Sequence, residues 1–255
     1  MTHWLSYGGG VNSTALLIML LDGRVAADPW RVLWADTRDE KDETYAYIYR
    51  EVMPRLHEAG RVLEVVCGKE GVLERFERLR VTGNRILRAC SVEAKIKPIV
   101  RHLQAHGTDE DQQLIGIDAG EAHRAKRNED FPQLFPRRYP LIDMDLDREA
   151  CEEIIRAAGW PVPPKSGCWH CPFMRVGEVI ALAVHAPDRF GRIVALEDAA
   201  NLTHPSADGT PRTQWGDKPA RQWLARARDE RGCNGPFQEH VDRDLPCGCY
   251  DGEAP

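Results

Sequence analysis

The sequence lacks any long hydrophobic run and any apolar leader. No segment of the 255 residues approaches the ~20 consecutive apolar residues that a membrane-spanning helix needs. The first residues also lack the charged and then apolar order of a secretory signal. We therefore expect a cytoplasmic protein with no membrane partner. The formal charge of -6 argues against binding nucleic acid over the whole surface, so such binding needs a local basic patch or a partner protein.

Two common phosphate-binding motifs are also missing. Residues 8–10 are three consecutive glycines, but no lysine follows them as in G-x-x-x-x-G-K-[ST], and the chain has no G-x-G-x-x-G. An apolar run precedes the glycines and an apolar helical pattern follows, which predicts a strand, a tight loop and a helix over residues 4–17. The residues expected to contact a phosphate there are Ser6, Gly8, Gly9, Gly10, Asn12 and Ser13.

Elementary physics favours an anion at such a loop. Glycines let the backbone turn with its N–H groups pointing inward, and the start of a helix adds unpaired N–H groups and a partial positive charge. Phosphate binds well in that environment. Asn12 and Ser13 stand where a capping or phosphate-contacting side chain would lie. The alternative is a glycine-rich turn that binds no ligand.

Strand and helix patterns alternate after this loop, which predicts an α/β fold with a doubly wound, mostly parallel sheet and helices on both faces. Further strands are expected at residues 30–37, 61–66 and 112–117, and helices at 44–56, 71–79 and 147–158. The stiff, proline-rich stretch 161–165 is expected to separate a domain of residues 1–165 from a smaller cysteine-bearing region of residues 166–255.

Polar and basic residues follow several of these elements. Asp36 and Thr37 lie at the carboxyl end of a predicted strand, where ligands bind in open α/β sheets. Ser91 is expected to cap a helix, with Lys95 facing outward one turn later beside an anion site.

The best local basic cluster of the chain is formed by Arg124, Lys126 and Arg127, joined by Arg137 and Arg138. For Lys126 and Arg127 taken alone, a solvated charged loop is an equal alternative.

The cysteines are the second feature of the sequence that indicates a functional site. Eight cysteines in a reducing compartment are not expected to form disulfides. Cys168 and Cys171 have the C-x-x-C spacing, which is compatible with zinc, an iron–sulfur cluster or a redox pair. Cys67 and Cys151 are expected to be buried structural residues.

These motifs, in this order, resemble those of the PP-loop ATP pyrophosphatases (adenine nucleotide alpha hydrolases), and in particular the branch that includes phosphoadenosine phosphosulfate reductase. Residues 6–13 resemble the S-G-G-x-D-S loop of the family, and residues 34–40 resemble its F-A-D-T-G-x-E run. Residues 88–98 resemble R-x-C-T-x-x-x-K-x-x-P, and residues 116–124 resemble G-I-x-x-x-E-x-x-R. Two positions depart from the family: Gly8 replaces a common serine, and Asn12 replaces an aspartate, which weakens a role for Asn12 in binding magnesium.

The resemblance implies how ATP would be held. The glycine loop would bind the pyrophosphate, while Asp36 and Thr37 would line the nucleoside side. Lys95, Arg124 and Arg127 would neutralise charge on the transferring group. Gly116 and Glu121 belong to the same expected nucleotide site, and a Mg²⁺ ion would bridge the phosphates. The residues expected to carry catalysis are Ser13, Asp36, Lys95 and Arg124.

Some members of this branch hold a [4Fe-4S] cluster, which implies a ligand set here. Cys90, Cys168 and Cys171 would be three of the ligands and Cys233 the preferred fourth, with Cys247 and Cys249 as alternatives. Zinc is the alternative metal.

The function implied is an ATP pyrophosphatase that forms AMP and pyrophosphate and adenylates an acceptor for sulfur incorporation. DNA phosphorothioation of the Dnd/Ssp type is favoured, with a cysteine desulfurase as sulfur donor and other subunits holding the DNA. The alternatives are a tRNA thiolation enzyme, a thiol-dependent phosphosulfate or adenylylsulfate reductase, and a non-enzymatic nucleotide sensor.

Overall fold

The computed structural model describes residues 1–83, 85, 88–129, 135–216, 218–223 and 225, with the backbone alone for residues 127–129. Its centre is a sheet of five parallel strands in the order β3-β2-β1-β4-β5. The strands are β1 (His3–Tyr7), β2 (Trp30–Asp36), β3 (Leu63–Cys67), β4 (Gln112–Ile115) and β5 (Arg137–Arg138). The predicted parallel α/β fold is confirmed.

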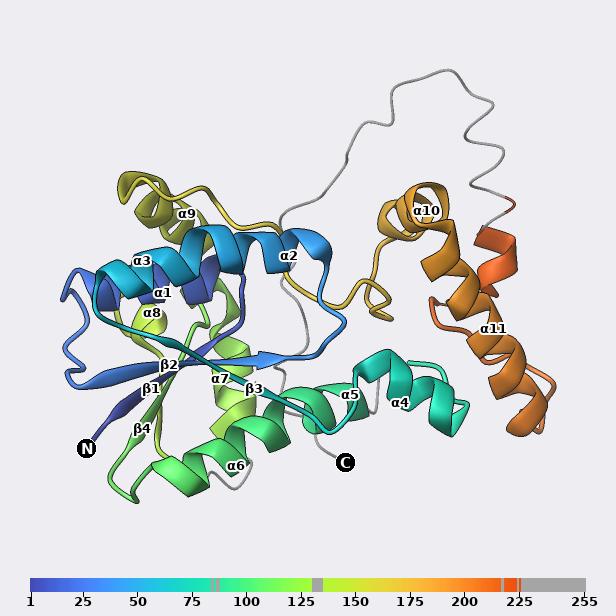
Figure 1. The fold of residues 1–255 in the computed structure, drawn as a ribbon, viewed down its shortest axis with the longest axis horizontal. Coiled ribbons are helices and arrows are strands. Elements are labelled where there is room, and N and C mark those ends of the chain that lie inside the picture. Colours follow the sequence, from blue (N-terminus) through green and yellow to red (C-terminus); the bar gives the residue numbers. More distant parts are fainter. Residues whose placement is uncertain (84, 86–87, 130–134, 217, 224, 226–255) are drawn as a thin grey trace.

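Side chains that alternate along the strands fill two separate cores. Leu5 and Tyr7 of β1 face the first core, whereas Trp4 faces the second. Helices cover both faces of the sheet, as Figure 1 shows. The first face carries α1 (Val11–Leu21), α2 (Asp42–Tyr47), a π-helical turn η1 (Ile48–Val52), α3 (Met53–Glu58) and α9 (Arg148–Ala157), and the second carries α6 (Lys97–His106).

A second, helical unit lies beside the sheet, at the right of Figure 1. It comprises α4 (Val72–Leu79), α10 (Val176–His185) and α11 (Pro187–Thr203). Its apolar core includes Phe76, Trp169, Phe190 and Trp215. Because α4 precedes residue 165, this core takes residues from both sides of the expected boundary.

The two units are joined through the loop that follows β2. Glu40 and Cys168 form an antiparallel bridge. The amide of Lys41 donates to the carbonyl of Gly167 at 3.0 Å, and the amide of Trp169 donates to the carbonyl of Asp39 at 2.9 Å. These backbone contacts hold the C-x-x-C segment against the loop at the carboxyl end of β2.

The remaining elements are short. They are α5 (Ala89–Ser91), the π-helical turn η2 (Val92–Ile96), the 3-10 turn η3 (Ala119–Glu121), α7 (Ala122–Glu129) and α8 (Pro140–Asp143). Two local predictions were wrong. Ser91 does not cap a helix, because α5 already begins at Ala89 after Arg88. Cys67 is exposed at the end of β3, whereas Cys151 is buried as expected.

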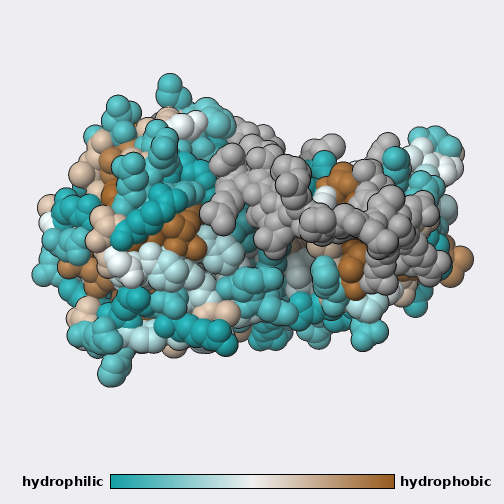
Figure 2. Space-filling view, turned by 90° about the horizontal axis from the view of Figure 1, so that it is seen from above, coloured by the Kyte–Doolittle hydropathy of each residue, from teal (hydrophilic) through white to brown (hydrophobic). Residues whose placement is uncertain are grey.

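The surface seen from above the sheet is mostly hydrophilic, with separate smaller apolar patches (Figure 2). None of the helices in the described part of the chain combines the length and apolar character needed to cross a membrane.

Candidate functional site

The order of the strands places a crevice at the carboxyl ends of β1 and β4. From β1 the chain builds outward to β2 and β3, and then returns to add β4 on the other side of β1. Ligands in open α/β sheets bind where the strand order reverses in this way. A pocket lies there, and its lining includes the predicted residues Ser6, Gly8, Gly10, Asn12, Ser13, Lys95, Gly116, Glu121 and Arg124.

The first turn of α1 faces this pocket. Gly10 is the N-cap, and no side chain caps the helix. Ser13 instead donates its hydroxyl to the carbonyl oxygen of Gly10 at 3.1 Å. Of the two roles considered for Asn12 and Ser13, capping is therefore not observed, and phosphate contact stays a prediction. The first amides of a helix have no carbonyl partner within it, and the first turn of α1 contains no acidic residue. This end of the helix therefore favours an anion.

Two glycines make the geometry possible. Gly9 has a φ of +75°, a region that L side chains rarely adopt. Gly116, after β4, lies so close to α1 that an added Cβ would be 2.9 Å from both N and Cα of Ser13. The loop after β4 can thus lie directly against the start of α1.

Asn12 links the loops that follow β1 and β4. Its Nδ2 donates to Oδ2 of Asp118 at 2.8 Å, and Oδ1 of Asp118 accepts the amide of Glu121 at 3.1 Å. The single amide oxygen of Asn12, Oδ1, is buried and has no hydrogen-bond partner among the described residues. An oxygen of this kind suits a hard divalent cation, which takes oxygen ligands and leaves several positions to water and phosphate. Asn12 therefore fits a bound Mg²⁺, although it lacks the charge of an aspartate.

Of the described residues, four with basic side chains line the pocket: Lys95, Arg124, Arg148 and Lys165. Arg124 donates from Nη1 to Oε2 of Glu121 at 2.7 Å, and both side chains are largely buried. This ion pair holds a guanidinium whose planar fork has the geometry to bind an oxyanion.

The outward orientation predicted for Lys95 was wrong. Lys95 is buried, and its Nζ lies 3.1 Å from Oε1 of Glu40. It lies on the π-helical turn η2, whose wider turn rotates later side chains away from the positions expected for a 3.6-residue period. Lys95 nevertheless lines the pocket, as its expected role requires.

Sequence reasoning missed Arg148 and Lys165. Arg148 is the first residue of α9, just after Asp147, which caps the helix by accepting the amide of Ala150 at 2.8 Å. Lys165 ends the proline-rich stretch. Its only sequence signal is its position shortly before Cys168, the first cysteine of the C-x-x-C pair.

Other predicted residues lie apart from the pocket lining. Asp36 accepts the hydroxyl of Tyr45 at 2.7 Å and the amide of Arg38 at 2.8 Å. Thr37 is buried, and its hydroxyl lies 3.3 Å from Oε1 of Glu40. Neither residue is part of the pocket lining, and neither is Gly9. The nucleoside-side role of Asp36 and Thr37 stays a prediction, as does the role of Arg127, whose side chain lies outside the described part.

The described cysteines of the expected ligand set, Cys90, Cys168 and Cys171, all border the core of the helical unit. Burial raises the pKa of the Cys168 thiol well above its usual value, raises that of Cys171 to about 11, and raises that of Cys90. The nearby Lys95 ammonium acts in the opposite direction on the pKa of each thiol. All three thiols are therefore neutral near pH ~7.

Within the described residues, no three or more His, Cys, Asp or Glu side chains are grouped as a metal site. Cys233, Cys247 and Cys249 lie outside the described residues. The cysteine ligand set stays a prediction.

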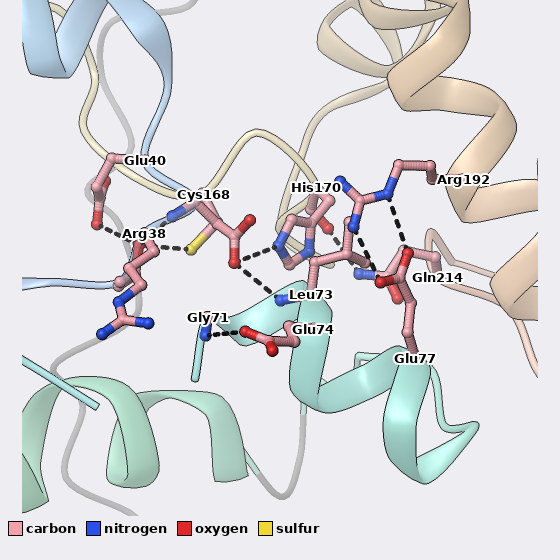
Figure 3. A network of polar contacts seen from close by, with 12 residues as sticks. Arg38, Glu40, Gly71, Leu73, Glu74, Glu77, Cys168, His170, Arg192 and Gln214 are labelled. Atoms are coloured by element: carbon pink, nitrogen blue, oxygen red, sulfur yellow. Dashed lines mark hydrogen bonds and ion pairs between the residues drawn. The ribbon is translucent and has the colours of Figure 1, made fainter. Parts of the chain in front are cut away.

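The C-x-x-C loop is held by polar contacts from several elements, as the close view in Figure 3 shows. Gln214 donates to the carbonyl of His170 at 2.6 Å, and Trp215 donates to the carbonyl of Cys171 at 3.1 Å. The His170 ring lies 3.7 Å from Oδ2 of Asp39, which also accepts the amide of Leu73 at 2.8 Å. Burial opposes ionisation of Asp39, but these contacts outweigh it and hold the pKa of Asp39 below its usual value.

Comparison with known proteins gives likenesses to solved structures. The chain matches no family model and no curated protein. It is similar to the phosphoadenylyl-sulfate (PAPS) reductase from Candida auris in its phosphate complex, with a TM-score of 0.45 and 15% identity over 67% of this chain and 82% of that one. It is also similar to the U34-tRNA thiolase NcsA from Methanococcus maripaludis with its [4Fe-4S] cluster, with a TM-score of 0.49 and 13% identity over 100% of this chain and 81% of that one. Likeness at this level assigns no activity to the chain.

Proposed function

We propose that this chain binds ATP in the pocket between β1 and β4 and cleaves it between the α and β phosphates to adenylate an acceptor. The observation that carries the proposal is the convergence of one uncapped helix start and four basic side chains on a single pocket at the point where the strand order reverses. Helix N-termini and paired cations are suited to a polyphosphate.

The residues would divide the work as follows. The backbone amides at the start of α1 would hold the outer phosphates, which leave as pyrophosphate. Arg124, fixed by Glu121, would face charge that develops as the bond to the α phosphorus breaks. Lys95, which also lines the pocket, would add positive charge.

A magnesium ion fits beside Asn12 Oδ1, and it would neutralise charge on the phosphate oxygens when bound. In the bond change itself, an acceptor oxygen would attack the α phosphorus, the bond to the bridging oxygen would break, and pyrophosphate would leave. The acceptor then carries AMP, which a sulfur nucleophile can displace.

The identity of the acceptor is a separate part of the proposal. We favour DNA as acceptor, with sulfur from a cysteine desulfurase, because the motif set resembles the reductase branch whose motifs the DNA phosphorothioation enzymes carry. Further subunits would bind the DNA, because this chain carries a charge of -6. A tRNA acceptor is the alternative.

The three thiols that lie near Lys95 favour one second candidate, a thiol-dependent reductase of a sulfonucleotide. Such an enzyme would bind adenylated sulfate in the same pocket and release sulfite.

Product analysis separates these functions. ATP labelled on the γ phosphate should yield labelled pyrophosphate and AMP, and Arg124→Gln should reduce that rate by about 100-fold, as loss of a transition-state donor does. Lys126→Gln is the matched control, because Lys126 is exposed and does not line the pocket. Labelled orthophosphate with ADP, or sulfite release from a sulfonucleotide with ATP unchanged, would contradict the proposal.

A further inference from the structure

Lys165 and Lys41 share one carboxylate on the helical unit. Oε2 of Glu178 lies 3.1 Å from Nζ of Lys165, and Oε1 lies 2.5 Å from Nζ of Lys41. The amide of Arg175 also donates to Oε2 of Glu178 at 2.9 Å. All three side chains of this trio, Lys41, Lys165 and Glu178, are largely buried, with 17–22% of each exposed.

The trio connects the pocket to the helical unit. Lys165 lines the pocket together with Gly8, Gly10 and Arg124, whereas Lys41 and Glu178 do not. Glu178 lies in the first turn of α10, on the other side of the loop contact between residues 39–41 and 167–169. The carboxylate therefore reaches from the helical unit to a cation that lines the pocket.

We infer that Lys165 is a phosphate-contacting residue of the pocket and that Glu178 is the positioning residue that holds its ammonium group there. The inference rests on the proposed function and adds a contact that the sequence motifs do not include.

Each ammonium group has three donors, so Lys165 can contact Glu178 and a ligand oxygen at once. Without the carboxylate, two ammonium groups would face each other in a largely buried position, and their repulsion would drive the flexible Lys165 side chain away from the pocket. The low pKa of Glu178, about 2, agrees with a carboxylate that stays ionised between two lysines: burial opposes its ionisation, but the Arg175 amide and the Lys41 and Lys165 ammonium groups outweigh that effect.

For Glu178→Gln, this arrangement predicts a change in anion affinity opposite to the one expected from net charge alone. Glu178→Gln makes the region more positive, so long-range attraction alone would tighten the binding of an anion. If Glu178 positions Lys165, the same substitution weakens binding, because the cation is no longer held in the pocket.

The test is calorimetric binding of inorganic pyrophosphate with Mg²⁺ to the full chain, with thermal unfolding of each variant as a check on folding. Lys165→Met should weaken binding about tenfold, the usual effect of losing one hydrogen bond to a charged group. Glu178→Gln should weaken it by a similar factor, and in the Lys165→Met background it should have little further effect, as expected for coupled residues.

Two control variants test whether the effect is specific to the pairing of Glu178 with Lys165. Glu77→Gln removes a carboxylate of the helical unit whose oxygen lies 2.9 Å from the guanidinium of Arg192. Neither residue lines the pocket, so this substitution should leave affinity unchanged. Lys41→Gln leaves Lys165 paired to Glu178, and should change affinity by less than about twofold.

The outcomes are distinct. A wild-type chain that binds neither pyrophosphate nor ATP overturns the proposed function and this inference with it. Wild-type binding that Lys165→Met leaves unchanged, or that Glu178→Gln tightens, overturns the inference alone. Independent, additive effects of the two substitutions would also overturn the positioning role.

Discussion

Glu40 and Lys95 form an ion pair of 3.1 Å in which only 1% and 6% of the two side chains are exposed. The second carboxylate oxygen of Glu40 accepts the amide of Gly167 at 2.9 Å. One carboxylate therefore joins the turn η2, the loop after β2 and the segment that carries the C-x-x-C motif. The pair also fixes the ammonium group that borders both the anion pocket and the three thiols.

Removing the charge of Glu40 should destabilise the fold strongly. Glu40→Gln can keep an oxygen for the Gly167 amide, but it leaves the buried ammonium of Lys95 without its carboxylate. Breaking a buried pair in this way costs about 3–5 kcal/mol of the unfolding free energy. Urea unfolding measures the loss, and a change below about 1 kcal/mol would show that the pair is not effectively buried.

Two further variants calibrate that result. Asp198→Asn removes an exposed partner of Arg221 and should change stability by less than about 1 kcal/mol. Glu40→Gln combined with Lys95→Met removes both buried charges and should recover much of the lost stability. Its affinity for pyrophosphate should nevertheless stay below that of the wild type, because it lacks the Lys95 ammonium group that lines the pocket.

Gly116→Ala tests the close contact between the loop after β4 and α1. The new Cβ would lie 2.9 Å from the backbone of Ser13, so the start of α1 must move. We expect a loss of about 1–3 kcal/mol in the unfolding free energy and weaker pyrophosphate binding. Gly177→Ala, in α10, is the control and should preserve binding, because the added Cβ would meet no described atom within 4 Å apart from its chain neighbours and the backbone of its own helix. Wild-type affinity in Gly116→Ala would count against an anion site at the start of α1.

The stability of the chain should depend on pH through Glu178. Its pKa in the folded chain is about 2, against an ordinary value of 4.5. Because the folded value is the lower one, the contribution is complete above the ordinary value and is lost as the pH falls toward 2. The difference in unfolding free energy between wild type and Glu178→Gln should therefore shrink over that range. A difference that stays constant with pH would contradict this assignment. Asp39, whose pKa is also lowered, contributes equally to both proteins.

The described cysteines should differ in their reaction with iodoacetamide. Cys67 is exposed, whereas burial raises the pKa of Cys168 well above its usual value and that of Cys171 to about 11. Because the thiolate is the nucleophile, peptide mapping by mass spectrometry should show Cys67 modified first. The modification of Cys171 should accelerate as the pH rises toward 11. Equal rates at all three positions would contradict the burial of the C-x-x-C loop.

The predicted metal has its own measurement. A [4Fe-4S] cluster should give anaerobically purified protein a brown colour and bound iron, both lost in Cys171→Ser and kept in Cys67→Ser. A colourless protein with bound zinc would favour the alternative metal. Protein without either metal would contradict the predicted ligand set of Cys90, Cys168, Cys171 and Cys233.

Local sequence patterns predicted the parts of the structure that depend on local physics. The glycines after β1 and the alternation of strands and helices predicted the strand, loop and helix at the start of the chain and the parallel sheet. Gly116 and Arg124 were expected at the site because of motif resemblance, and both line the pocket.

The errors arise where the fold departs from regular periods or brings distant segments together. A π-helical turn buries Lys95, which a regular helix would have placed outward. Lys165 and Glu178 are separated in sequence by a loop and part of a helix, so no spacing rule could pair them. Cys67 looked buried because it ends an apolar strand, but β3 lies at the edge of the sheet.

The most direct test of the account is a crystal structure of the chain with Mg²⁺ and an ATP analogue that has a methylene group between the α and β phosphates. We predict the β and γ phosphates against the backbone amides at the start of α1, with Arg124 and Lys165 in contact with phosphate oxygens. Nucleotide bound elsewhere, or a pocket filled by its own basic side chains, would contradict the account.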